Sequence, residues 1–233
     1  MTTSGRLAML ALADARFPGG GHVHSGGLEE ATHRGVVTRP EELREFLFGR
    51  LHGTGELAAV FAAAATHSAA GGAGRQYWLR FDAELDARTP SPAQRDASRA
   101  QGRGTARAGR VAWPSSALDE LLAATARPHH ATVLGVLLGG SGNGTPRDAA
   151  AVAAYLALSG SASAAVRLLG LDPFAANAAV TELGPELDRV AERAADTVGD
   201  DPADLPAPSA PALDLLAEAH QRHHREEVRL FAS

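Results

Sequence analysis

The sequence contains no lysine and no cysteine, and it is poor in aromatic residues. All 22 basic residues are therefore arginine, which excludes a Schiff-base lysine and the Gly-Lys-Ser/Thr of a nucleotide-binding P-loop. Without cysteine the chain forms no disulfide, no thiolate nucleophile and no cysteine-ligated zinc site. Aromatic residues make up only 5%, so we expect leucine, valine and alanine to fill the core.

The charge and the hydropathy of the chain limit its partners and its location. The formal net charge is −5, which argues against nucleic acid as a partner. The sequence shows no charged leader followed by an apolar signal core, and no apolar run that we expect to cross a bilayer. We therefore expect a cytoplasmic protein that has no membrane partner.

Helical periodicity and helix caps predict an all-α fold. Alternating β-branched runs are nearly absent, and several Ser, Thr or Asp caps precede a proline in the first turn of an expected helix. We expect a single-domain bundle of about eight to ten helices. The expected helices span residues 5–15, 28–34, 38–66, 77–87, 91–112, 116–124, 129–138, 145–169, 172–198 and the first part of 212–233.

Residues 1–233 are predicted to form one domain that contains two segments of distinct character. Residues 200–211 are rich in proline and aspartate, a composition typical of a flexible linker. Residues 220–233 form a C-terminal tail that we expect to be helical at first and then extended. A further glycine-rich stretch, residues 139–144, precedes an expected helix and fits either a phosphate loop or a flexible connection.

The stretch from Asp14 to Glu30 is a glycine-rich polar turn between two apolar helices. Within it, His22 and His24 have a spacing that places two imidazoles on one metal in several hydrolase folds. Those hydrolases need further His and Asp ligands. The alternative is a polar loop whose histidines make hydrogen bonds.

The tail carries a second group of histidines on one helical face. These are His220, His223 and His224, with Glu227 one turn further on. A transient nickel or zinc site and a solvated, titratable face are both consistent with this pattern. The H-E-x-x-H pattern of zinc proteases is absent.

One expected helix carries a basic stripe with a spacing of four residues. Its members are Arg95, Arg99, Arg103 and Arg107. This face fits either docking to an acidic partner or a solvated surface. Gly102 and Gly104 lie in the same helix, where glycine is costly, and they indicate either a close backbone approach or a break.

No catalytic apparatus is visible in the sequence. It contains no G-x-S-x-G nucleophile elbow and no distinct pair of carboxylates. The residues therefore indicate a helical binding or scaffold protein with no cofactor of its own.

Three stretches resemble the UreF family of urease accessory proteins. The family's opening signature is matched at Leu10, Leu12, Pro18, Gly20, Ser25, Gly27, Leu28, Glu29, Ala31 and Gly35. Residues 163–168 are similar to a later Ala-Ala-Val-Arg-Leu helix of the family, and residues 222–223 and 229–233 to its closing Arg-His…Arg-Leu-Phe-x-Ser. His22, His24 and His224 stand where an aromatic residue, tyrosine and glutamate are common.

The resemblance implies an all-helical protein that dimerises and has no enzymatic activity. UreF-like proteins bind UreD, also called UreH, and this pair recruits the GTPase UreG, which UreF is proposed to regulate. The assembly delivers nickel to apo-urease. The residues that the resemblance points to for partner binding are Arg16, Pro18, Gly20, Ser25, Glu29, Arg222, His223, Arg229, Leu230 and Phe231.

Two alternatives from other functional classes stay open at this point. A metal-dependent hydrolase would use His22, His24 and the tail histidines, and it would hold stoichiometric metal. A standalone nickel-binding chaperone would need a denser histidine cluster than this chain has.

Overall fold

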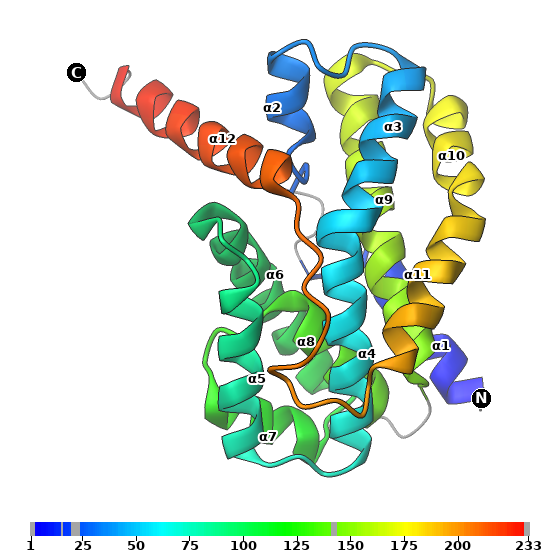
Figure 1. The fold of residues 1–233 in the computed structure, drawn as a ribbon, viewed down its shortest axis with the longest axis vertical. Coiled ribbons are helices and arrows are strands. Elements are labelled where there is room, and N and C mark those ends of the chain that lie inside the picture. The colour runs from blue at the N-terminus through cyan, green and yellow to red at the C-terminus, as the bar shows by residue number, and fades with distance from the viewer. Residues whose placement is uncertain (1–2, 15, 20–23, 141–143, 231–233) are drawn as a thin grey trace.

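The computed structural model describes residues 3–14, 16–19, 24–140 and 144–230, with the side chains of 3–6 and 224–230 left out. In this part of the chain all regular structure is helical, which confirms the predicted all-α class (Figure 1). The helices are α1 (Thr3–Ala13), α2 (Leu28–His33), α3 (Pro40–Arg50), α4 (Glu56–Ala70), α5 (Arg75–Ala87), α6 (Pro92–Ala112), α7 (Ser116–Ala124), α8 (His130–Gly140), α9 (Pro146–Leu169), α10 (Pro173–Glu182), α11 (Gly184–Asp196) and α12 (Pro211–Leu230).

The helices are arranged around a long rod made of α3 and α4, which runs beside α9 (Figure 1). Helices α10 and α11 pack along one side of this pair, and α5 to α8 gather on the other side of α4. Helix α2 lies near one end of the rod. Helix α12 packs on α2 and α6, and its C-terminal end projects beyond the outline of the other helices.

The rod has a capped first turn and a π-helical turn near its middle. Pro40 occupies the first turn of α3, and the Glu42 carboxylate accepts hydrogen bonds from the backbone N–H and the hydroxyl of Thr38, both at 2.8 Å. Within the range expected as one helix, a π-helical turn, Leu51–Gly55, joins α3 to α4. A Cβ at Gly53 would lie 2.5 Å from the Cβ of Ala210, so the turn also makes room for the segment before α12.

Helices α4 and α8 form the closest packing in the core. Thr66 of α4 donates its hydroxyl to the carbonyl oxygens of Ala62 at 2.9 Å and Gly135 at 3.1 Å. A Cβ would lie 2.3 Å from the Ala62 oxygen if added at Gly135, and 2.3 Å from the Thr66 oxygen if added at Gly139. Glycines spaced by four residues thus let one helix backbone rest directly on the other.

Helix α9 is the central helix, and it corrects one expectation from the sequence. Its 24 residues are long and apolar enough to span a bilayer by length and composition, although we had expected no such run. More than half of its apolar window is buried inside the protein, against α4, α10 and α11. Small side chains dominate this buried surface, among them Ala149, Ala153 and Ala165. We therefore describe α9 as a core helix.

Two further differences concern the second half of the chain. The single helix expected over 172–198 is two helices, because the backbone turns at Leu183 and Pro185 restarts it in the first turn of α11. The tail stays helical through Leu230, and the extended end that we expected falls on residues outside the description.

The connection between α11 and α12 contains no helix, and its first part lies against α5. The Arg88 guanidinium donates to the carbonyl oxygens of Ala203 at 2.7 Å and Leu205 at 3.2 Å. The Arg80 guanidinium pairs with the Asp201 carboxylate at 2.7 Å. The Leu205 side chain is 3% exposed and belongs to the core. These contacts hold the chain along the body of the bundle before α12 begins.

Candidate functional site

The described residues in the first part of the opening turn, 14 and 16–19, lie near the second half of α6. The Arg16 guanidinium donates three hydrogen bonds to the Asp14 carboxylate, and these, with one from the Arg16 backbone N–H, hold the Asp14 pKa at about 2. The ring of Phe17 stacks on Trp113 at the end of α6, with centroids 6.1 Å apart. A Cβ at Gly104 would lie only 2.9 Å from the Gly19 carbonyl oxygen. Of the two alternatives that the sequence left open at Gly104, a close backbone approach and a helix break, the structure shows the close approach.

The second part of the opening turn, residues 24–27, leads into α2 through two glycines in the left-handed region. Gly26 has φ 67° and Gly27 has φ 92°, which other residues adopt only under strain. The Ser25 hydroxyl accepts a weak 3.4 Å hydrogen bond from the Glu29 N–H, and the Ser25 carbonyl accepts one from the Ser161 hydroxyl at 2.9 Å. The bond to Ser161 holds this turn against α9, and the turn sets the direction in which α2 begins.

The opening turn and the tail meet where α12 crosses α2. The Glu30 carboxylate accepts a hydrogen bond from Arg34 Nε at 2.6 Å and pairs with His223 Nδ1 at 3.0 Å. The rings of His33 and His223 lie 5.3 Å apart, edge to face. We call the region formed by Ser25, Glu29, Glu30, His220 and His223 the α2–α12 surface.

The electrostatics of this surface centre on Glu30, whose side chain is 2% exposed. Burial alone would raise the pKa of Glu30, but the hydrogen bonds from Arg34 and His223 outweigh it and lower the pKa below its ordinary value. The neighbouring Glu29 carboxylate lies 3.8 Å from His220 Nε2. Two carboxylates of α2 therefore face two histidines of α12, and this pairing ties α12 to the bundle at His220 and His223.

The structure separates the residues that the sequence pointed to into two groups. Ser25, Glu29 and His223 belong to the α2–α12 surface, and Arg222 is exposed beside it. Arg16 and Pro18 lie with the first part of the turn on α6, and both are exposed. Gly20 and Phe231 fall outside the described residues, as does His22, and for Arg229 and Leu230 only the helical backbone is described.

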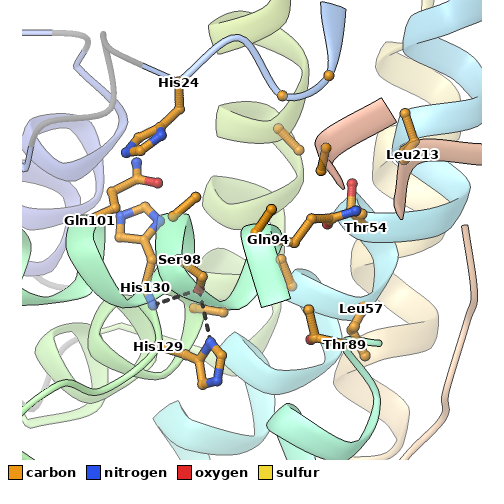
Figure 2. Close-up of a pocket in the computed structure, with 18 of the residues that line it drawn as sticks. His24, Thr54, Leu57, Thr89, Gln94, Ser98, Gln101, His129, His130 and Leu213 are labelled. Atoms are coloured by element: carbon orange, nitrogen blue, oxygen red, sulfur yellow. Dashed lines mark hydrogen bonds between the residues drawn. The ribbon is translucent and has the colours of Figure 1, made fainter. Parts of the chain in front are cut away.

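The histidines do not gather into a metal site within the part of the chain that the structure describes. No group of three or more His, Cys, Asp or Glu side chains is placed there to hold an ion. His24 lies near His130 and Gln101 (Figure 2). Burial and the nearby His24 lower the pKa of His130 to about 4, so this imidazole is neutral at physiological pH.

The docking interpretation of the arginine stripe on α6 needs a correction. The first half of the stripe, Arg95 and Arg99, binds groups of the protein itself. The Arg99 guanidinium, 14% exposed, pairs with the carboxylates of Asp82 at 2.8 Å and Asp86 at 2.7 Å on α5. Arg95 donates to the Thr89 carbonyl at 2.6 Å. Only the second half of the stripe is exposed, at Arg103, Arg107 and the following Arg110.

The same network includes a buried histidine. His129 lies between Asp86, whose Oδ1 is 2.9 Å from Nε2, and the Ser98 hydroxyl, 3.0 Å from Nδ1 (Figure 2). Burial and the charge of Arg99 lower the pKa of His129 below its ordinary value. Gly102 lets α6 lie close to the backbone of residues 128–130, because a Cβ at position 102 would overlap the Pro128 carbonyl oxygen. This is the close approach that the sequence left open against a helix break.

A cavity of about 440 Å³ opens between α2, α4, α6, α8, α9 and α12 (Figure 2). His24, Gln101 and His130 lie toward one side of it, and Thr54 and Gln94 toward the other. Its wall includes four residues of α12, Leu213, Ala217, His220 and Gln221. The tail helix therefore covers the cavity from one side.

Comparison with known proteins identifies the family. The UreF family model matches residues 37–184 of the chain. The sequence is also 46% identical over 225 residues to the urease accessory protein UreF of Mycobacterium sp. (strain JLS), covering 97% of both chains. The chain belongs to the UreF family. UreF of Mycolicibacterium vanbaalenii is 44% identical over 234 residues, covering 99% of this chain and 100% of the relative. UreF of Mycobacterium tuberculosis (strain ATCC 25618 / H37Rv) is 43% identical over 226 residues, covering 97% of each.

Membership of the UreF family decides between the classes that the sequence left open. UreF proteins are non-catalytic urease accessory proteins, so the hydrolase alternative built on His22 and His24 is wrong. The role of this UreF-family chain lies in the maturation of urease.

Sequence reasoning missed two residues that shape the site. Glu30, the buried acceptor for the tail, was passed over in favour of Glu29, although both stand in the first turn of α2. Arg50, which lines the cavity and binds the Gly26 carbonyl at 2.7 Å, had no signal in its neighbourhood. Position 30 lies on the buried face of α2, where an apolar residue is usual. A carboxylate at this position was therefore the available sign that Glu30 has a partner inside the protein.

Proposed function

We propose that this UreF-family chain is a scaffold that binds UreD (UreH) and then recruits the GTPase UreG to apo-urease for nickel insertion. The observation that carries the proposal is the geometry of α12. Its first half is anchored on α2 and α6, and its second half projects beyond the bundle (Figure 1). A helix that extends past the body offers backbone and side chains to a partner without unfolding the core.

The partner-binding part of the tail runs from Arg222 to Phe231. Arg222 and Arg229 supply guanidinium groups for charge-assisted hydrogen bonds, and Leu230 and Phe231 supply apolar anchors. His223 has a different part in this proposal, because it faces Glu30 at 3.0 Å. It fixes where the bundle ends and where the free segment of α12 begins.

A pull-down with purified UreD tests the tail directly. We compare the full chain with a chain that ends at Arg222 and with the double variant Leu230→Ala, Phe231→Ala. Leu79→Ala is the matched control, because Leu79 is 40% exposed on α5, away from the tail. We expect both tail variants to lose UreD and the control to keep it. Full UreD binding by the chain that ends at Arg222 would refute the role of the tail.

The opening turn is our candidate for presenting UreG with a composite surface. Ser25 and Glu29 lie beside the base of α12, so a partner on the tail would reach them as well. Arg16, Pro18 and Gly20 belong to the same turn, and the first two are exposed near α6. Measuring GTP hydrolysis by UreG, with and without this chain and UreD, tests whether the scaffold regulates the GTPase. An unchanged rate would remove regulation from the proposal and leave recruitment.

We further propose that the chain forms a homodimer in the cytoplasm. Leu168 at the end of α9 and Phe174 at the start of α10 are 42% and 85% exposed, so they offer apolar side chains to a second copy of the chain. Light scattering on the purified protein checks the state in solution. A mass of one chain at all concentrations would contradict the dimer.

A further inference from the structure

The cavity contains one cation whose setting the partner proposal does not explain, Arg50. This residue ends α3 and reaches across to two backbone carbonyls. Its Nε donates to the Ala157 oxygen at 2.8 Å, and its Nη1 donates to the Gly26 oxygen at 2.7 Å. A Cβ at Gly26 would lie 2.4 Å from the Arg50 Cζ, so the left-handed glycine leaves room for the guanidinium.

The Arg50 guanidinium has donors left over after these two bonds. Of the five N–H groups of a guanidinium, two are used by Ala157 and Gly26, which leaves three. No Asp or Glu carboxylate among the described side chains forms an ion pair with it. Burial lowers the Arg50 pKa to about 10, which shows how strongly the surroundings disfavour the charge. Arg50 is partly buried, and cations withdrawn from water in proteins are normally paired with an anion.

The space beside Arg50 is suited to an organic ligand. The cavity volume of about 440 Å³ lies within the range of small-molecule sites, and Arg50 lines it. Thr54, one turn further along the rod, also lines it and has a buried hydroxyl without a hydrogen-bond partner. Apolar side chains form much of the remaining wall, among them Leu57, Leu134 and Leu213.

We propose that this cavity binds a small organic acid, with its carboxylate on Arg50 and Thr54 and its apolar body against the leucines. The carboxylate supplies the anion that Arg50 lacks, and the Thr54 hydroxyl gains an acceptor. Glu29 and Asp96 also line the cavity, so a multiply charged anion such as phosphate is disfavoured relative to a monocarboxylate. The inference does not depend on the proposed binding of partners to residues 222–231.

Calorimetric titration of the full-length protein with hexanoate tests the proposal. Hexanol, which has the same apolar body without the charge, and inorganic phosphate are the comparison ligands. We expect hexanoate to bind and both comparison ligands to bind at least about tenfold more weakly. Absence of hexanoate binding at millimolar concentration overturns the proposal, and so does equal binding of hexanol or tighter binding of phosphate.

Variants then locate the binding. Arg50→Gln and Thr54→Val should each weaken hexanoate, the first by about tenfold or more. Arg103→Gln, on the exposed part of α6, should leave binding unchanged. Because Arg50→Gln also loses two structural hydrogen bonds, Ala217→Phe provides a second test by filling the cavity from α12. Retained hexanoate binding in a folded Arg50→Gln or Ala217→Phe protein would overturn the assignment.

Discussion

Replacing Gly135 by alanine tests how α8 rests on α4, the contact from which the rest of the bundle is built. The added Cβ would lie 2.3 Å from the Ala62 oxygen, 2.6 Å from the Ala65 Cβ and 3.0 Å from the Thr66 nitrogen. Two of these neighbours are backbone atoms of α4, which no side-chain rotation can move away. The two helices must therefore separate, and the hydrogen bond from Thr66 to the Gly135 carbonyl must lengthen.

The expected loss of stability follows from two opposing effects. Overpacking a core costs about 1–3 kcal/mol, and a clash with backbone places Gly135→Ala near the upper value. Alanine returns about 1 kcal/mol through its higher helix propensity. The net loss is about 2 kcal/mol, which lowers the melting temperature of a chain of this length by about 4–8 °C.

Urea unfolding followed by circular dichroism measures this difference. Gly49→Ala is the matched control, because Gly49 lies inside α3 with no atom within 4 Å of an added Cβ. That variant should gain up to about 1 kcal/mol from helix propensity alone. If Gly135→Ala is as stable as Gly49→Ala, the account of close α4–α8 packing is refuted.

Three further predictions concern charged groups. Burial lowers the pKa of His130 from 6.5 to about 4. Between pH 6.5 and about pH 4, His130 therefore takes up a proton in the unfolded chain but not in the folded one. Stability should therefore fall by about 3 kcal/mol from this group as the pH drops through that window, and His130→Gln should remove this part of the loss in urea unfolding. Arg99→Leu removes the ion-pair partner of Asp82 and one partner of Asp86 and should cost about 3 kcal/mol, whereas Arg103→Gln should change stability by less than about 0.5 kcal/mol in the same assay. Glu30→Gln weakens the bond to His223 and should speed amide hydrogen exchange along α12; unchanged exchange would contradict the anchoring role of Glu30.

The helices could be predicted from the sequence because their signals are local. A proline in the first turn, a capping side chain or a glycine at the end of a periodic run is read within a few residues. Gly102 and Gly104 were also recognised, since glycine inside a helix is costly unless a backbone passes close by. The restart of the helix at Gly184 was missed, because apolar periodicity continues across the turn at Leu183.

The site was less predictable, because it depends on pairs that are far apart in the sequence. Arg99 carries no mark that distinguishes it from Arg103, yet only Arg99 faces the carboxylates of α5. Glu30 meets His223 across 193 positions, and Arg50 meets Ala157 across 107. Tertiary packing decides which arginine pairs inside the protein and which is exposed. The residues next to each arginine in the sequence do not indicate this difference.

Activation of urease from purified components is the most direct measurement of the central claim. Apo-urease, UreD, UreG, nickel, GTP and bicarbonate are mixed with the full chain, with the chain that ends at Arg222, or with neither. We predict that urease activity rises only with the full chain. Equal activity in the mixture without this chain would contradict its role as the scaffold that brings UreD and UreG to urease.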